Sequence, residues 1–122
     1  MIKNLGIIDY GSGNIHSLKC ALEKIGANVK IITNDTQNNI DALFIPGVGS
    51  FDNAIHKLSK MQLDKYIKKF NDDKKIIIGI CLGMQIMVEE GIENGICEGL
   101  KLLSGKTYKL PYKDKEKWKN IG

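Results

Sequence analysis

Four short, predominantly apolar runs alternate with amphipathic stretches along this chain, and this alternation most restricts the folds it can form. The apolar runs occupy residues 5–9, 29–33, 42–45 and 76–80. Strands that are apolar throughout are buried on both faces, as in parallel sheets. Neighbouring parallel strands need a crossover connection, which is usually a helix. We therefore expect an α/β fold of the doubly wound, flavodoxin-like type, with a mostly parallel sheet and helices on both faces.

The stretches between these runs carry apolar residues at helical spacing. Three stripes predict helices: Ile15, Leu18, Leu22 and Ile25; Phe51, Ala54, Ile55 and Leu58; and Leu63, Tyr66, Ile67 and Phe70. Asn14 is expected to cap the first helix and Gly26 to end it. Further along, we expect a glycine-punctuated stretch over residues 91–99 and then a pair of strands at residues 100–103 and 106–110.

Size and composition are those of a soluble globular chain with room for a single domain. The chain has 122 residues, of which 43% are apolar and 26% charged, so disordered and collagen-like classes are excluded. No apolar run approaches the roughly 20 residues of a membrane span. Residues 1–9 lack a charged leader and a cleavage site, so we expect a cytoplasmic protein. The net charge of +4 comes from scattered lysines, so we expect no nucleic-acid partner.

The three cysteines, Cys20, Cys81 and Cys97, are an odd number at wide, irregular spacings. This spacing fits neither a disulfide framework nor a zinc site. We expect reduced thiols, and neither a metal nor a cofactor. Cys20 and Cys97 are interpreted as packing or surface residues.

Cys81 differs because it stands where the last apolar run stops, between Gly79 and Gly83. A strand that turns abruptly into a helix presents one side chain at the tip of the sheet, which is the geometry of a nucleophile elbow. The start of the helix favours a thiolate, and the Leu82 N–H points at any oxyanion formed there. A cysteine that only packs, between glycines that only permit close contact, is the alternative. The strand, the glycine pair and the helix together favour the nucleophile.

Two more turns are expected at the same edge of the sheet, because ligands bind outside the carboxyl ends of parallel strands. These turns cover residues 9–14 and 46–50. The second contains Gly47, Val48 and Gly49, a loop whose N–H groups can turn toward a ligand and supply a second oxyanion donor. An ordinary tight turn is its alternative. Gln85 lies one helical turn after the cysteine, where its amide can hold a polar group of a substrate.

Two sequence features that a binding or catalytic site of this kind could contain are missing from the chain: a dinucleotide fingerprint and a clear base for the cysteine. The turn at residues 10–14 lacks the third glycine of a dinucleotide fingerprint, so nucleotide binding is not expected. A cysteine nucleophile normally needs a base, and the chain offers only His16 and His56. Both are predicted to be structural or solvated, and no His-x-Glu pair occurs.

Three segments, residues 8–14, 44–51 and 79–85, together resemble the glutaminase subunits of imidazole glycerol phosphate synthases, within the class I glutamine amidotransferases. The similarity runs from residue 1 to about residue 110. The resemblance implies that Cys81 attacks the carboxamide of glutamine, that a glutamyl thioester forms, and that ammonia passes to a (β/α)8-barrel synthase in histidine biosynthesis. The two proteins would form a heterodimer.

The same resemblance implies roles for further residues in three groups. The oxyanion hole would be lined by Leu82, Gly47, Val48 and Gly49. Glutamine would be held by Gly49, Gln85 and Glu93. The barrel synthase would be met by the loop that carries Tyr10 and Asn14.

The chain departs from the family in two ways. The family continues further, with the histidine and glutamate of its triad, so residues 1–122 are expected to be the N-terminal portion of one amidotransferase domain, incomplete at its C-terminus and inefficient alone. Lys119 and Asn120 stand where the family has Pro-His. A paralogue that supplies ammonia for surface-sugar biosynthesis is therefore one alternative, and a catalytically incomplete fragment that only binds the partner is another. A cysteine hydrolase or redox sensor on a similar sheet is a third.

Overall fold

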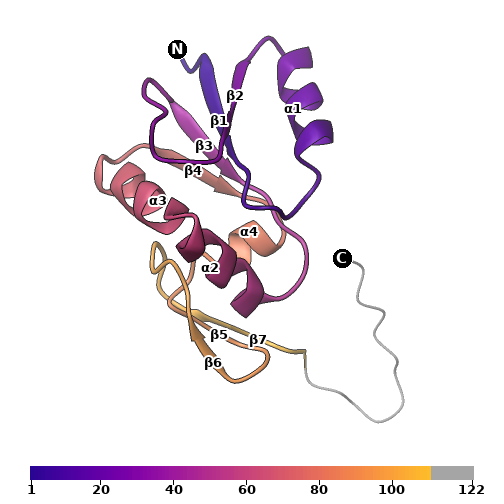
Figure 1. Cartoon of the computed structure of the whole chain (residues 1–122), viewed down its shortest axis with the longest axis vertical. Coiled ribbons are helices and arrows are strands. Elements are labelled where there is room, and N and C mark those ends of the chain that lie inside the picture. The colour runs from indigo at the N-terminus through magenta and orange to yellow at the C-terminus, as the bar shows by residue number, and fades with distance from the viewer. Residues whose placement is uncertain (111–122) are drawn as a thin grey trace.

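A computed structural model of the chain describes residues 1–110, which form two sheets with helices packed around the first (Figure 1). The first part of the chain contains β1 (Asn4–Ile8), α1 (Ile15–Lys24), β2 (Asn28–Ile32), β3 (Ala42–Ile45), α2 (Phe51–Lys60) and α3 (Leu63–Asp72). The remainder contains β4 (Ile76–Gly79), α4 (Leu82–Gln85), β5 (Glu90–Ile92), β6 (Ile96–Glu98) and β7 (Lys106–Tyr108).

The first sheet has four parallel strands in the order β2-β1-β3-β4. Ile7 lies opposite Ile31 on one neighbour and Phe44 on the other, and Phe44 lies opposite Ile78. The predicted parallel sheet and α/β fold are confirmed. Each strand begins within one residue of its predicted start. The expected burial holds for β1 and most of β3, whereas Ile76 and Ile78 of β4 are exposed, since β4 is the edge strand of the sheet within residues 1–110.

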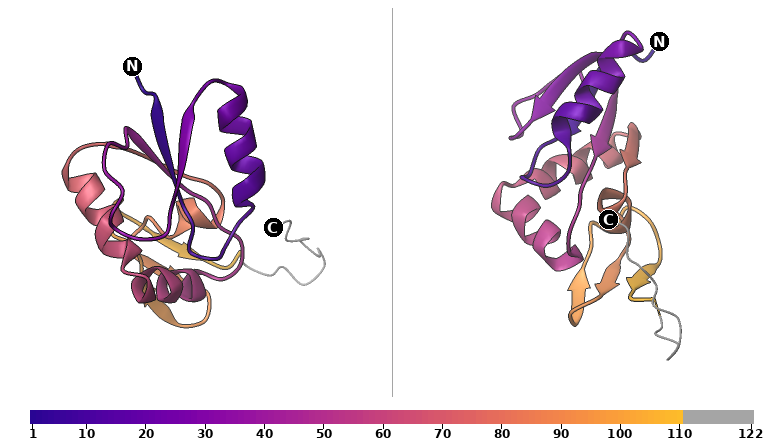
Figure 2. Two further views of the ribbon diagram at one scale, coloured as in Figure 1. Left: turned by 45° about the horizontal axis from the view of Figure 1, so that its top comes forward. Right: turned by 90° about the vertical axis from the view of Figure 1, so that its right-hand side faces the viewer.

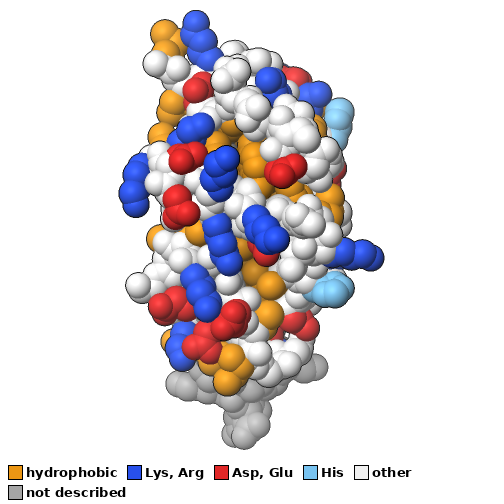
Figure 3. Space-filling view, turned by 60° about the vertical axis from the view of Figure 1, so that its left-hand side comes forward, with side chains coloured by type: hydrophobic (Ala, Val, Ile, Leu, Met, Phe, Trp, Pro, Cys, Tyr) orange, Lys and Arg blue, Asp and Glu red, His pale blue; other side chains and the backbone are white. Residues whose placement is uncertain are grey.

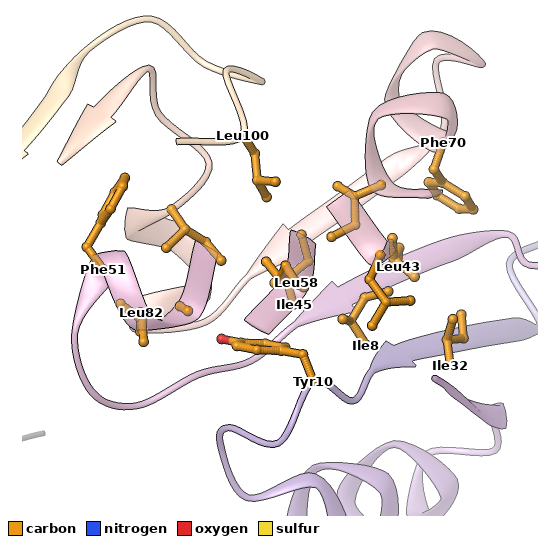
Figure 4. Close-up of a cluster of buried hydrophobic side chains, with 14 of the residues drawn as sticks. Ile8, Tyr10, Ile32, Leu43, Ile45, Phe51, Leu58, Phe70, Leu82 and Leu100 are labelled. Atoms are coloured by element: carbon orange, nitrogen blue, oxygen red, sulfur yellow. The ribbon is translucent and has the colours of Figure 1, made fainter. Parts of the chain in front are cut away.

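Helices cover both faces of this sheet, as expected. The left-hand view of Figure 2 shows α1 on one side of the strands and α2 and α3 on the other. On the first side, Leu22 packs against Leu5, Ile7 and Ala42. The larger core lies on the second side, and its side chains include Ile8, Ile32, Leu43, Ile45, Leu58, Phe70, Leu82 and Leu100 (Figure 4).

The second sheet corrects the prediction for the last part of the chain. Its order is β6-β5-β7, so the stretch expected to be only glycine-punctuated contains two antiparallel strands. Residues 100–103 are not a strand, since their amides donate to the carbonyls of residues 86–88. Leu100 is buried in the core and Lys101 takes a left-handed φ of 56°, which bends the backbone away from a sheet. The strand predicted at residues 106–110 is present as β7 and pairs parallel with β5.

The helix predicted after Cys81 exists but is short. α4 ends after one turn, and residues 86–88 then accept hydrogen bonds from residues 100–103. A one-turn helix aligns few peptide dipoles, so the predicted electrostatic contribution of the helix at Cys81 rests on its first amides rather than on a long dipole.

Charged side chains of both signs are interspersed on the face shown in Figure 3. Among residues 1–110, no helix has the length and apolar character that crossing a membrane requires. Lys119 and Asn120, where the sequence departs from the family pattern, lie outside the described residues.

Candidate active site

Three turns meet at the carboxyl edge of the parallel sheet, as the sequence predicted. They follow β1, β3 and β4, which are neighbours in the sheet. The Tyr10 hydroxyl donates a 2.8 Å hydrogen bond to Pro46 O, which joins the first turn to the second. Ile80 N donates to Ile45 O at 2.9 Å, which joins the second to the third. The three turns therefore form one connected site.

Cys81 occupies the tip of the elbow with an uncommon backbone conformation. Its φ of 54° and ψ of −119° lie in a region that residues with a Cβ rarely adopt. The turn is held by hydrogen bonds from Gly83 N to Ile80 O at 3.0 Å and from Met84 N to Cys81 O at 3.0 Å. The cysteine is exposed rather than buried among aliphatic side chains.

Two glycines allow the β3 loop and the elbow to touch. A Cβ on Gly83 would fall on the backbone carbonyl of Ile45. A Cβ on Gly47 would meet the Tyr10 hydroxyl and would approach Leu82 Cβ at 3.2 Å. Real Cβ atoms do not make such contacts, so side chains at these two positions would force the turns apart. Gly83 and Gly47 thus serve close packing between the turns, the role that the sequence offered as the alternative for the glycines around Cys81.

The buried side chain of Tyr10 packs beneath the turn after β3 and is hydrogen-bonded to it. Its side chain is only 2% exposed, and Figure 4 shows its hydroxyl directed toward the part of α4 where Leu82 lies. Burial raises the pKa of Tyr10, with a smaller contribution from the nearby Cys81, so the hydroxyl stays protonated and donates at neutral pH. A direct contact between this buried side chain and a partner protein is not available, and any effect of Tyr10 on an interface is indirect.

Ser12 holds the Val48 peptide by two hydrogen bonds. Ser12 Oγ donates to Val48 O at 2.7 Å and accepts from Val48 N at 2.9 Å. No separate role was predicted for this serine from the sequence, although its place in the first turn was the available signal. In this conformation the Val48 N–H is occupied and does not face an empty oxyanion position.

The remaining predicted donors lie nearby. Leu82 is buried at the start of α4, and within residues 1–110 its N–H donates to no acceptor. Gln85 is half-buried at the end of the same turn, and its side chain makes no hydrogen bond within the described residues. Gly49 follows Val48 in the β3 loop. These groups remain candidates for oxyanion and substrate binding.

Glu93 reaches the site from the turn between β5 and β6. Its Oε2 accepts a 3.1 Å hydrogen bond from Phe51 N, at the first residue of α2. That position directly follows the loop of Gly49 and Ser50. A carboxylate at a helix start is stabilised by the free amides there. Glu93 therefore lies beside the predicted substrate-binding loop.

Asn14 and the histidines have clear structural positions. Asn14 Oδ1 accepts from Ser17 N at 3.1 Å, which confirms the predicted N-cap of α1. His16 is exposed on α1, with Nε2 3.6 Å from Cys20 Sγ, and His56 is exposed on α2. No hydrogen bond joins Cys81 to either histidine within residues 1–110. In that part of the chain no group of three His, Cys, Asp or Glu side chains is placed to hold a metal ion.

Comparison with known families identifies the class of protein that this fold and site define. The family described as "Glutamine amidotransferase class-I" matches residues 6–122. Because the match covers nearly the whole chain, the chain belongs to the class-I glutamine amidotransferase family. The fold class and the resemblance to this family are confirmed.

Particular relatives carry a narrower name. The chain is 44% identical over 115 residues to the "Imidazole glycerol phosphate synthase subunit HisH" of Bacillus velezensis, an alignment that covers 92% of this chain and 53% of that protein. It is 41% identical over 123 residues to the protein of the same name in Prochlorococcus marinus MIT 9211, covering 100% of this chain and 58% of that protein. The chain thus spans about half the length of the curated relatives it matches.

Solved structures agree on the fold. A structure described as "Crystal structure of glutamine amidotransferase" matches with a TM-score of 0.72 at 18% identity, covering 85% of this chain and 55% of that one. A putative peptidase E from Listeria monocytogenes matches with a TM-score of 0.57 at 20% identity, covering 72% and 50%. At these identities the two matches describe the architecture alone.

Proposed function

We propose that this chain carries the nucleophile-bearing part of the glutaminase of an imidazole glycerol phosphate synthase. The observation that carries the proposal is Cys81, exposed at the tip of a strained elbow whose Leu82 and Gly83 pack against the glycine loop after β3. Family membership and relatives named as subunits of that synthase support it. The alternative of ammonia supply for surface sugars finds no support among these relatives.

In the proposed reaction, Cys81 Sγ attacks the carboxamide carbon of glutamine and forms a carbon–sulfur bond. The carbonyl oxygen becomes an oxyanion, and collapse of this tetrahedral species breaks the carbon–nitrogen bond. The leaving nitrogen takes up a proton and departs as ammonia. Water then attacks the thioester, which releases glutamate and restores the thiol.

The Leu82 N–H and the amides of the loop after β3 are proposed to stabilise the oxyanion. Preorganised N–H donors of this kind commonly contribute about 3 kcal/mol to a transition state. The Val48 N–H can join them only after its hydrogen bond to Ser12 breaks, because a single N–H cannot face both acceptors. The loop therefore has to change its conformation for Val48 to take the proposed role.

Substrate binding is proposed for Gly49, Gln85 and Glu93. The free side-chain amide of Gln85 suits the polar end of glutamine, and the carboxylate of Glu93 suits its ammonium group. The exposed turn around Asn14 is proposed to face a (β/α)8-barrel synthase, which would receive the ammonia. Histidine biosynthesis in the cytoplasm is the proposed setting.

A general base is the missing component. Since neither His16 nor His56 contacts Cys81, we propose that sustained turnover needs a base from outside residues 1–110. Alkylation of Cys81 by a chloroketone needs only its thiolate, because chloride, unlike the amide nitrogen of glutamine, leaves without taking up a proton. Reaction with such a reagent therefore tests whether the nucleophile is present, whereas sustained turnover of glutamine tests whether the enzyme is complete.

The test is covalent labelling with a chloroketone analogue of glutamine, read by mass spectrometry of tryptic peptides. Labelling is expected on Cys81 ahead of Cys20, although both are exposed. Cys81→Ser should lose the label, and Cys20→Ser should keep it. Equal labelling of Cys20 and Cys81, or no protection by glutamine, would contradict the proposed site.

A further inference from the structure

A cavity lies at the edge of the parallel sheet opposite the carboxyl edge that carries Cys81. Its volume is about 250 Å3, and it is formed between the loop that precedes β3 and helix α3. Asn39 and Ile40 come from the loop, Lys65 and Lys69 from α3, and Lys75 from the residue before β4. None of the residues of the three catalytic turns lines it. The proposed glutaminase chemistry therefore leaves this cavity without a role.

The cavity gathers ammonium groups that have no carboxylate partner. Lys65, Lys69 and Lys75 come from two separate segments, and within residues 1–110 no Asp or Glu oxygen lies within 4.0 Å of their Nζ atoms. Asp35 and Asp73 also line the cavity, so its lining carries one net positive charge. Asp41 also lies close enough to Lys75 for the lysine to help lower its carboxyl pKa, although Asp41 does not line the cavity. A net positive charge around a concave surface concentrates anions there.

The walls are held in place by side chains that also face the cavity. Lys75 Nζ donates to Ile40 O at 3.3 Å and lies 5.0 Å from the centre of the Phe70 ring. The Tyr66 hydroxyl donates to Gln37 O at 3.2 Å, and burial raises the pKa of Tyr66, so this bond persists at neutral pH. The loop before β3 is thus tied both to α3 and to the start of β4.

Polar groups suited to hydroxyls surround the charged ones. Gln37, Asn38, Asn39 and Gln62 supply side-chain amides, each of which both donates and accepts hydrogen bonds. Asn39 and Gln62 also have left-handed φ values of 62° and 57°, an uncommon conformation for residues with a Cβ. The volume is below the roughly 300 Å3 of the smallest typical drug-sized pockets, which excludes a dinucleotide.

We propose that this cavity binds a small sugar phosphate. The lysine ammonium groups would hold the phosphate as point charges, and the amides would hold the sugar hydroxyls. The cavity is separate from the proposed glutaminase site, so failure of one proposal would leave the other unaffected.

The test uses the whole chain labelled with ¹⁵N and titrated with ribose 5-phosphate. Backbone amides of residues 37–40 and 65–70 should shift and saturate, whereas those of residues 79–85 should not. Inorganic phosphate should shift the same amides more weakly, and ribose should shift none of them. Equal responses to ribose and ribose 5-phosphate would exclude recognition of the phosphate.

A matched pair of variants separates the cavity from general surface charge. Lys65→Gln combined with Lys69→Gln removes two cavity charges and should weaken binding about tenfold or more, since hydrogen bonds to charged groups are the stronger ones. Lys60→Gln removes an exposed charge on α2 that does not line the cavity, and it should leave binding within about twofold because screened charges act weakly at a distance. Equal losses in both variants, or shifts spread over lysines elsewhere in the wild-type chain, would overturn the proposal. The wild-type map decides the question even if the double variant does not fold.

Discussion

Ser12 Oγ both donates to Val48 O and accepts from Val48 N, at 2.7 and 2.9 Å. One hydroxyl thus saturates both polar groups of the residue at the centre of the glycine loop. The loop after β3 is thereby fixed by the turn after β1, from a position 36 residues earlier in the chain. The Val48 N–H, a proposed oxyanion donor, and the Ser12 hydroxyl that accepts its hydrogen bond therefore belong to different turns of the same site.

Ser12→Ala should release the Val48 peptide. Loss of two partly exposed hydrogen bonds should lower the free energy of unfolding by about 1 kcal/mol. The freed Val48 N–H should speed reaction of Cys81 with the glutamine chloroketone, whose addition product is also an oxyanion. Ser12→Thr, which keeps the hydroxyl, is the control and should react as the wild type does. A slower reaction in Ser12→Ala would mean that the hydrogen bonds hold the loop in its reactive form.

Gly83→Ala should disrupt the contact between the elbow and β3. The added methyl group would overlap the backbone carbonyl of Ile45, which cannot move without breaking the strand. We expect a loss of about 3 kcal/mol in urea unfolding, at the upper end of the range for overpacking. Gly11→Ala is the comparison, because Gly11 has open space around it but a φ of 81°. It should cost only the roughly 1–2 kcal/mol of a left-handed Cβ. Similar losses in both variants would remove the steric explanation.

Tyr10→Phe should change stability in a way that depends on pH. The folded-state pKa of Tyr10 is raised above its ordinary value of 10.0, so its stabilising contribution is complete below that value and is lost as the pH rises through the folded pKa. At neutral pH the variant should be less stable by about 1–2 kcal/mol, because Pro46 O loses its buried donor.

Above about pH 10 the difference between wild type and Tyr10→Phe should shrink, as urea unfolding at a series of pH values would show. Tyr66→Phe is a useful second variant, because burial raises the pKa of Tyr66 in the same direction but its hydroxyl donates to Gln37 O, remote from the elbow. A constant difference between wild type and Tyr10→Phe from neutral to alkaline pH would contradict this account.

Ile78→Lys should reduce self-association. β4 is the edge of the parallel sheet within residues 1–110, and Ile76 and Ile78 on one of its faces are 49% and 38% exposed. An apolar edge strand without charge or proline pairs readily with another chain. Sedimentation velocity should therefore show concentration-dependent association of the wild type.

The control for that measurement is Ile25→Lys, which replaces a side chain that is 79% exposed at the end of α1, away from the sheet edge. It should associate as the wild type does, whereas Ile78→Lys should stay monomeric. A wild type that stays monomeric at every concentration, or equal reductions of self-association by the two lysine substitutions, would show that β4 is not the self-association surface.

The elements that the sequence predicted well are those specified by local chemistry. The predominantly apolar runs predicted β1 to β4, and the stripes of Leu18, Leu58 and Ile67 predicted their helices, because burial and periodicity are properties of neighbouring residues. The second sheet was mostly missed. Residues 96–98 read Ile-Cys-Glu, too short for a clear period, and they became a strand only by pairing with β5.

By itself the sequence determined which residues are proposed to carry chemistry: a cysteine between two glycines at a strand end, and a second glycine loop after the preceding strand. Only the tertiary structure decided how they are arranged. It placed Tyr10 in the core, engaged the Val48 amide with Ser12 and brought Glu93 to the start of α2. These contacts join residues 36 to 42 positions apart. The pairing of β1 with β3 brings the first two contacts together, and the packing of the second sheet beside α2 brings the third, and no local sequence pattern encodes either arrangement.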